Sequence, residues 1–75
     1  NPFSEHMTLS FSGTSENITV EITDMSGQRV EFKDNVDPSQ SLYVGSELPR
    51  GVYLVKVGNT MYQQVIKVQK QWFWH

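Results

Sequence analysis

Hydrophobic and polar residues alternate over short stretches of this 75-residue chain, with turn-forming residues between the stretches. The clearest case is residues 18–23, where Ile18, Val20 and Ile22 take every second position. Because neighbouring side chains of a β-strand point to opposite faces, this pattern predicts a strand with one buried and one wet face. The same reasoning predicts further strands at Met7–Phe11, Leu42–Val44 and Met61–Val68.

Residues 52–57 form the most apolar stretch, in which only Lys56 is charged. Its side chains are expected to divide between two faces, with Tyr53, Val55 and Val57 on one and Val52, Leu54 and Lys56 on the other. A strand that is apolar on most of both faces is typical of the middle of a sheet. We therefore predict that residues 52–57 form the central strand.

Turn residues separate the predicted strands. Asp24–Gly27 has the residues of a type I turn, and Gly27 is expected to be left-handed in a G1 bulge. Pro49 and Gly51 fit the second and fourth positions of another type I turn, directly before the central strand. Gly58-Asn59 predicts a two-residue hairpin after it.

The strand that returns from the Asp24–Gly27 turn carries two apolar residues among charged ones. Val30 and Phe32 are expected to face inward on this strand. The charged residues are expected to face outward: Arg29, Glu31 and Lys33. No stretch of useful length has a helical period, and short strands roughly 10 residues apart are typical of sandwiches. The predicted fold is all-β, an immunoglobulin-like antiparallel β-sandwich of about 6–7 short strands. Residues 1–70 are expected to form this single domain, and residues 71–75 an aromatic tail.

Composition narrows the function classes. The chain contains no cysteine, which excludes disulfides and thiolate chemistry. Its apolar runs are too short to cross a bilayer, so we predict no transmembrane segment. The net charge of −2 argues against general binding to nucleic acid.

The distribution of charge is uneven. Residues 1–47 carry a net charge of −6, whereas residues 48–75 carry +4 and contain no acid. One interpretation is a basic docking face built from the last two strands. The other is that Lys56 and Lys67 lie beside Glu21 and Glu31 on neighbouring strands, as cross-strand pairs.

No group of residues has the spacing of a catalytic or metal site. His6 and His75 stand alone at opposite ends of the chain. The loop with Asp34, Asn35 and Asp37 lacks the length and carboxylate count of a calcium loop, and turn formation explains these residues. No serine has a nearby histidine with a positioning acid. We therefore predict neither an enzyme nor a cofactor.

Gly51 and Tyr53 form a Gly-x-Tyr sequence at the start of the predicted central strand. This sequence resembles the tyrosine corner of immunoglobulin-like sandwiches. There the ring packs inside and the hydroxyl bonds a nearby backbone group. The predicted role of Tyr53 is therefore structural.

Four segments, taken in order, resemble a known family. They are Asn1-Pro2-Phe3, residues 18–30 (ITVEITDMSGQRV), residues 48–57 (LPRGVYLVKV) and residues 65–67 (VIK). The set is similar to the C-terminal sorting domains, in the class called type A, of the Bacteroidota type IX secretion system. The matching positions are Asn1, Pro2, Gly27, Pro49, Gly51, Tyr53 and Lys67.

This resemblance implies a non-catalytic domain at the C-terminus of a secreted enzyme or adhesin. It implies an address for passage across the outer membrane, with the protein finally secreted or held at the cell surface. The implied partners are the type IX secretion machinery, a sortase-like peptidase, and a cargo domain earlier in the same precursor. The peptidase cut is expected upstream of Asn1.

Lys67 and Lys70 are the candidate recognition residues, because the last strand is the region of the family most tied to export. The alternative is that they are exposed lysines on an edge strand, where they prevent aggregation of sheets.

The aromatic tail suggests a second function class. The chain continues past the last predicted strand through Trp72-Phe73-Trp74, whose role the sequence leaves open. An accessory or adhesion module would bind carbohydrate through two or more coplanar aromatic rings on one exposed face. The candidate aromatic residues are Tyr43, Tyr62, Trp72 and Trp74.

Overall fold

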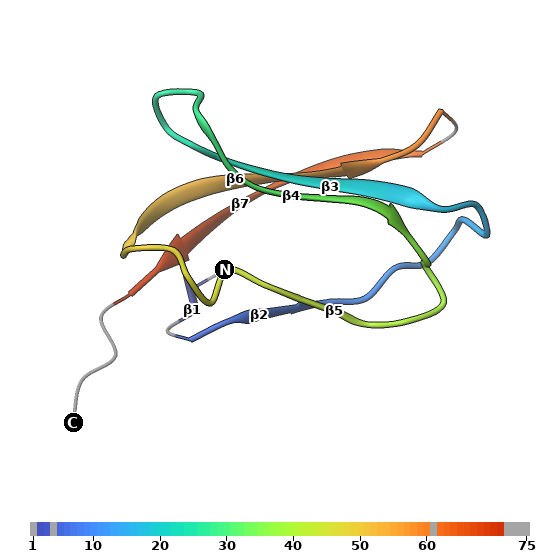
Figure 1. The fold of residues 1–75 in the computed structure, drawn as a ribbon, viewed down its shortest axis with the longest axis horizontal. Coiled ribbons are helices and arrows are strands. Elements are labelled where there is room, and N and C mark those ends of the chain that lie inside the picture. The colour runs from blue at the N-terminus through green and yellow to red at the C-terminus, as the bar shows by residue number, and fades with distance from the viewer. Residues whose placement is uncertain (1, 4, 61, 72–75) are drawn as a thin grey trace.

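The computed structural model covers residues 1–75 and describes residues 2–3, 5–60 and 62–71. Within this described part the chain forms seven strands and no helix. In chain order they are β1 (Pro2–Phe3), β2 (Met7–Leu9), β3 (Ile18–Asp24), β4 (Arg29–Val36), β5 (Leu42–Val44), β6 (Gly51–Gly58) and β7 (Gln63–Lys70) (Figure 1).

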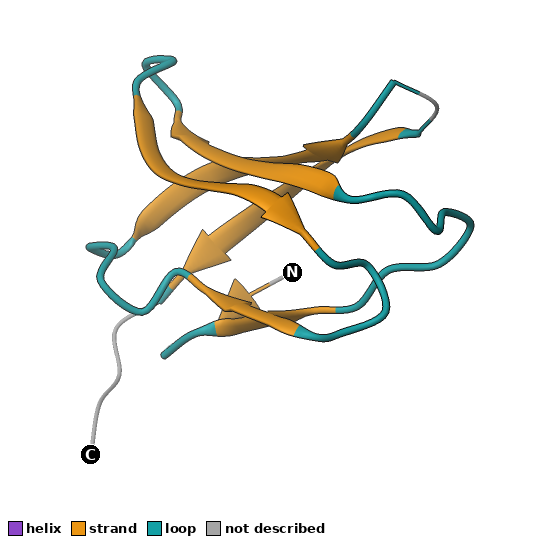
Figure 2. Ribbon diagram, turned by 45° about the vertical axis from the view of Figure 1, so that its right-hand side comes forward, coloured by secondary structure: helices purple, strands orange, loops and turns teal. Residues whose placement is uncertain are grey.

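The strands form two layers (Figure 2). One is a five-stranded sheet in the order β1-β7-β6-β3-β4, and the other pairs β2 with β5. The smaller sheet lies across one face of the larger one (Figures 1 and 2). The predicted β-sandwich is thus confirmed. One pairing departs from the antiparallel pattern, because β1 runs parallel to β7.

β6 is the middle strand of the five-stranded sheet, as the sequence predicts for residues 52–57. Tyr53, Val55 and Val57 are buried against the smaller sheet, while Lys56 is exposed on the opposite side. We call that opposite side, which faces away from β2 and β5, the outer face. The buried side completes a core drawn from both layers: Met7, Ile18, Val20, Ile22, Val44, Leu48, Tyr53, Val55, Val57 and Val68.

The register between β3 and β4 shifts by one residue near the turn. Thr23 pairs with Arg29, but its neighbour Ile22 pairs with Glu31, so Val30 is an extra residue on β4. A shift of one residue moves every following side chain to the other face of the strand. Arg29, before the shift, lies on the outer face as predicted, but the faces predicted for Phe32 and Glu31 after it are wrong.

The consequences are visible along β4. Phe32 pairs with Glu21 on the outer face and is 42% exposed instead of buried. Glu31 lies on the inner face, where its carboxylate accepts a hydrogen bond from the Gly45 N–H at 3.0 Å. Lys33 pairs with Val20 and remains exposed at the sheet edge.

The predicted turn at Asp24–Gly27 is confirmed. The Gly27 N–H donates to the Asp24 carbonyl at 3.0 Å, and Gly27 is left-handed with φ of 92°. The Asp24 N–H donates to the Gln28 carbonyl at 2.9 Å, which is the pairing of a G1 bulge. The Asp24 carboxylate also accepts hydrogen bonds from the Ser26 and Gln28 amides and the Ser26 hydroxyl.

The turn predicted at Pro49 lies earlier in the chain. The Leu48 N–H donates to the Gly45 carbonyl at 3.3 Å, and this bond closes a turn over residues 45–48. Pro49 follows that turn, and the chain bends at Arg50 before β6 begins at Gly51. Gly51 is therefore the first residue of β6 and not the last residue of a turn.

The connection between β6 and β7 is longer than the two residues predicted. β6 continues through Gly58 and β7 begins at Gln63, so residues 59–62 connect them. The Asn59 N–H donates to the Tyr62 carbonyl at 2.7 Å within this connection. A strand therefore runs over Gln63–Lys70 where the sequence pattern predicts Met61–Val68.

Tyr53 makes the predicted corner. Its side chain is only 5% exposed, and its hydroxyl donates to the Pro49 carbonyl at 2.5 Å. The bond ties the segment before β6 to the strand itself. Tyr53 thus stabilises the fold in two ways, through its buried ring and through the hydrogen bond of its hydroxyl.

We predict that Tyr53→Phe lowers the free energy of unfolding by about 1 kcal/mol, because one buried hydrogen bond is lost. Tyr53→Ala should cost about 3–5 kcal/mol, because it also empties the space of the ring. Urea unfolding followed by fluorescence measures both values. A Tyr53→Ala domain that melts within a few degrees of the wild type would contradict the corner assignment.

Two turns should weaken in acid. Hydrogen bonds from the Ser26 hydroxyl and the Gln28 amide hold the pKa of Asp24 below 3.8, and the Ser39 amide and hydroxyl lower the pKa of Asp37. Because these pKa values are lower in the folded state, the stabilisation is complete above the unfolded value and disappears as pH falls through the folded one. We predict that Asp24→Asn with Asp37→Asn flattens the pH dependence of the urea midpoint below about pH 4. An unchanged dependence would contradict this expectation.

Candidate recognition surface

Two rows of side chains cross the outer face of the five-stranded sheet. Glu21 of β3 pairs with Phe32 of β4 on one side and Lys56 of β6 on the other, and Lys56 pairs with Val65 of β7. The second row, one step along the strands, consists of Arg29, Thr23, Leu54 and Lys67. Strand pairing therefore brings residues from four strands onto one continuous surface.

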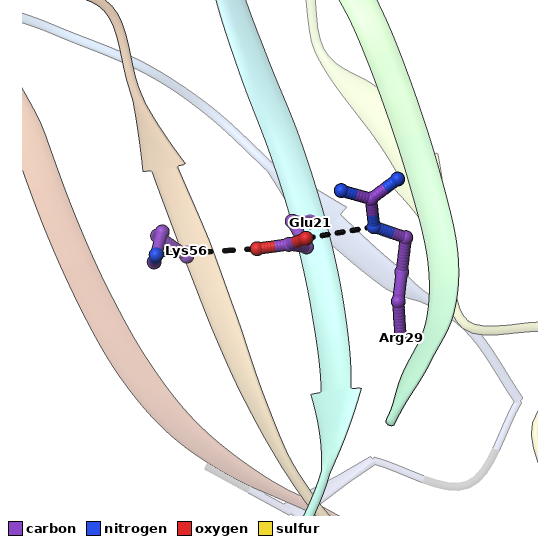
Figure 3. Close-up of polar contacts among 3 residues, drawn as sticks. All are labelled: Glu21, Arg29 and Lys56. Carbon is purple, nitrogen blue, oxygen red and sulfur yellow. Dashed lines mark hydrogen bonds and ion pairs between the residues drawn. The ribbon is translucent and has the colours of Figure 1, made fainter. Parts of the chain in front are cut away.

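Cations outnumber acids within these rows. The Glu21 carboxylate lies 2.7 Å from Arg29 Nε and 4.0 Å from Lys56 Nζ (Figure 3). The two cations lie on opposite sides of this one carboxylate, with side chains 56% and 64% exposed. The Arg29 guanidinium also lies over the Phe32 ring, 4.3 Å from its centroid, in a cation–π contact. Lys67 adds a third cation, which leaves the rows with a net positive charge.

The same face exposes apolar area. Phe32 is 42% exposed and Val65 is 58% exposed, while Leu54 between the second-row cations is half-buried. Glu21, Arg29 and Phe32 border a shallow hollow of about 340 Å³ beside them. Arginine and aromatic residues are enriched in protein interfaces, so Arg29 over the exposed Phe32 ring is typical of a protein-binding patch.

Lys67 lies on this outer face and is exposed. Its cross-strand neighbour is Leu54, so the predicted pairing of Lys67 with Glu31 is wrong. Glu31 is on β4, which β3 and β6 separate from β7, and the register shift at Val30 also carries Glu31 to the inner face. The other predicted pair, Lys56 beside Glu21, is confirmed.

Lys70 is buried, contrary to the expectation of an exposed lysine. Only 8% of the residue is exposed, and its ammonium donates to the Gly45 carbonyl at 2.7 Å and to the Ser46 carbonyl at 3.1 Å. Alternation along β7 could have predicted the burial of Lys70, because Lys70 shares its face with Ile66 and Val68. The ammonium fixes the turn that precedes β6.

The other motif positions lie in turns and at strand ends. Pro2 is in β1 beside Gln69, and Gly27 is in the turn between β3 and β4. Pro49 and Tyr53 form the corner, as described above. None of these four residues belongs to the two rows of the outer face, and Asn1 lies outside the described residues.

The candidate carbohydrate-binding aromatics do not share a face where the structure describes them. Tyr43 is 67% exposed on β5 of the smaller sheet, where its ring lies 5.1 Å from the His6 ring. Tyr62 follows β6 of the larger sheet, packs against the core and donates its hydroxyl to the Gln64 side chain at 2.8 Å. The positions predicted for Trp72, Phe73 and Trp74 lie outside the described residues.

Neither metal ligation nor membrane spanning has a candidate in the described ranges. Those ranges hold no cluster of three or more histidine and acidic side chains suited to a metal ion. They also contain no helix with the length and apolarity needed to cross a membrane.

Comparison with known families shows the family to which this chain belongs. A family model described as the secretion system C-terminal sorting domain matches residues 1–71, which include all seven strands. The chain belongs to this family. The resemblance seen in the sequence is therefore confirmed, and the sorting domain is a C-terminal signal of type IX secretion. This family implies export to the cell surface or the extracellular space. No curated protein and no solved structure matches the chain significantly.

Sequence reasoning did not place three residues of the outer-face rows in a recognition surface: Arg29, which it expected to face outward, Phe32 and Val65. A pattern of alternation assigns Phe32 to the core, and only the extra residue at position 30 reverses that assignment. Val65 is an apolar residue of the strand that the sequence predicts at Met61–Val68. Its exposure follows from its position opposite Lys56 on the outer face of the sorting domain.

We predict that Lys70→Met and Lys67→Met differ sharply in stability. Lys70→Met should lower the free energy of unfolding by about 1–3 kcal/mol, because two backbone carbonyls lose a charged donor. Lys67→Met should change it by less than about 0.5 kcal/mol, as is usual for an exposed residue. Urea unfolding of both variants tests the contrast. Equal effects would contradict the different environments of the two lysines.

Proposed function

We propose that this sorting domain is a non-catalytic address that the type IX machinery reads in the folded state, through the outer face of the five-stranded sheet. One observation supports the proposal most directly. Arg29, Lys56 and Lys67 stand on this face with Glu21 as the one acid of the two rows, although the chain as a whole is acidic.

The partner surface that fits this face is acidic, with apolar groups placed to meet Phe32 and Val65. Opposite charge steers two proteins together and suppresses wrong partners, while exposed apolar groups supply buried area on contact. Phe32 and Val65 provide such groups at the two ends of the Glu21 row. Because four strands hold these side chains, the surface is already formed before the partner arrives.

Lys67 is the strongest single candidate for recognition. Arg29 and Lys56 both lie near the Glu21 carboxylate, whereas no ion pair involves Lys67 among the described residues. Its charge is therefore the least neutralised of the three and is available to a partner. We assign Lys70 a supporting role, in which it holds the turn at Gly45 and Ser46 and keeps β7 in place.

The proposal includes removal of the domain after export. A sortase-like peptidase cuts the precursor upstream of Asn1 and separates the cargo from the address. β1 begins the described chain and lies beside the end of β7, so the connection to the cargo leaves from that side of the sheet. The carbohydrate-binding alternative gains no support from Tyr43 and Tyr62, which belong to opposite layers.

Export of a reporter fused to residues 1–75 tests the address in a host with a type IX system. We predict that Lys67→Glu reduces secreted reporter by about tenfold, because a repulsive charge in a complementary interface costs at least 1–2 kcal/mol. Lys33→Glu makes the same chemical change on an exposed lysine of β4 outside the two rows and should leave export near the wild-type level.

Both variants must first be shown to unfold at the wild-type urea concentration, so that a folding defect is not mistaken for lost recognition. Equal export by wild type, Lys67→Glu and Lys33→Glu would overturn the role of Lys67. An equal loss in both variants would show that total charge matters and that the outer face does not.

A further inference from the structure

β7 has one fully paired edge and one edge that is mostly open. It pairs with β6 over its whole length, from Gln63 to Lys70. On its other side, β1 pairs only with Gln69 and Lys70. Among the described residues, the main chain of residues 63–68 therefore has no strand partner on this side.

The opposite edge of the sheet is protected in the ways that proteins usually protect an edge strand. The pairing of β4 has two register shifts, and Asn35 in β4 has φ of 56°. β4 also contains four charged residues: Arg29, Glu31, Lys33 and Asp34. Bulges and charges of this kind prevent another strand from adding to the edge.

The open part of β7 lacks these features. Its pairing with β6 proceeds without a register shift, and residues 63–68 contain no proline and one charge, Lys67. A regular, weakly charged edge presents unpaired N–H and C=O groups to any extended chain beside it. The contrast with β4 indicates that this edge is kept open for a strand.

We infer that the segment preceding Asn1 in the secreted precursor extends β1 as a parallel strand along the open edge of β7. The existing register sets this course, because Pro2 pairs with Gln69 and Phe3 with Lys70. In this register the residue before Asn1 lies beside Lys67, and the chain upstream of it runs beside Ile66 and then Val65. Since β1 already tethers this segment to the edge, pairing is intramolecular and does not depend on concentration.

The side chains of β7 define the chemistry of the added strand. The position beside Ile66 faces the core side, so the segment is expected to carry an apolar residue there. The alternate position beside Lys67 faces the outer side and suits a polar or acidic residue. The expected segment is therefore an alternating one with few prolines and glycines.

This strand would also regulate the proposed cut, and that consequence rests on the proposed function. A peptidase takes an extended substrate out of the sheet, so the paired segment is protected until β1 is released from β7. The strand pairing itself does not depend on where, or whether, the peptidase cuts. Its test can therefore fail or succeed independently of export and removal.

Hydrogen exchange followed by NMR provides the test, with three forms of the protein. The first is residues 1–75, and the second adds the ten residues that precede them in the natural precursor. The third adds ten Gly and Ser residues instead, which have low strand propensity and flexible chains. The readout is exchange of the amides of residues 65–67 that do not bond to β6.

We expect these amides to exchange about tenfold more slowly in the form with the natural extension than in the other two, as one added backbone hydrogen bond permits. Replacing alternate residues of the natural extension by proline should abolish the protection, because proline cannot donate to a ladder. Equal exchange in all three forms would overturn the inference. Protection of residues 1–75 alone that rises with protein concentration would also overturn it, since a second copy would then occupy the edge.

Discussion

Burial of one side of β3 and β6 is the constraint on which the other features of this domain depend. A chain of 75 residues has barely enough apolar side chains for one core, and all the apolar inner residues of the two central strands belong to it. Ile22 and Val55 are fully buried, and Tyr53 adds a buried ring with a bonded hydroxyl. Because period-two alternation fixes the inner side, the outer positions of the same strands can carry other groups, which are polar on β3 and both apolar and charged on β6.

Much of this arrangement could be predicted from the sequence, because local patterns determine it. Alternation at residues 18–23, the central position of residues 52–57 and the left-handed Gly27 turn all depend on near neighbours. The faces of β4 could not be predicted, because the extra residue at Val30 is a property of strand pairing. The parallel pairing of β1 with β7 joins the two ends of the chain and has no local signal. Lys70 is the intermediate case: alternation places it inside, but the carbonyls that accept its ammonium come from a distant turn.

The structure separates residues that hold the fold from residues that are available to a partner. Tyr53 and Lys70 both bond backbone carbonyls of the segment before β6, at Pro49 and at Gly45 and Ser46. Lys67 is three positions from Lys70 in sequence but stands on the opposite face, beside Leu54 in the outer rows. In the basic C-terminal part of the chain, Lys70 therefore stabilises the fold, whereas Lys67 is exposed to a partner. The family assignment gives the domain its role in type IX secretion, and the outer face is where we propose that the role is performed.

The central claim is that export requires the side chains of the outer face, even when the stability of the domain is unchanged. The most direct measurement plots secreted reporter against the free energy of unfolding for a set of variants of the domain. Changes at Tyr53 and Lys70 should define one curve, on which export falls only as the domain unfolds. The account predicts that charge reversals at Lys56 and Lys67 fall well below this curve at unchanged stability. If all the variants fall on one curve, export depends on folding alone and the claim is contradicted.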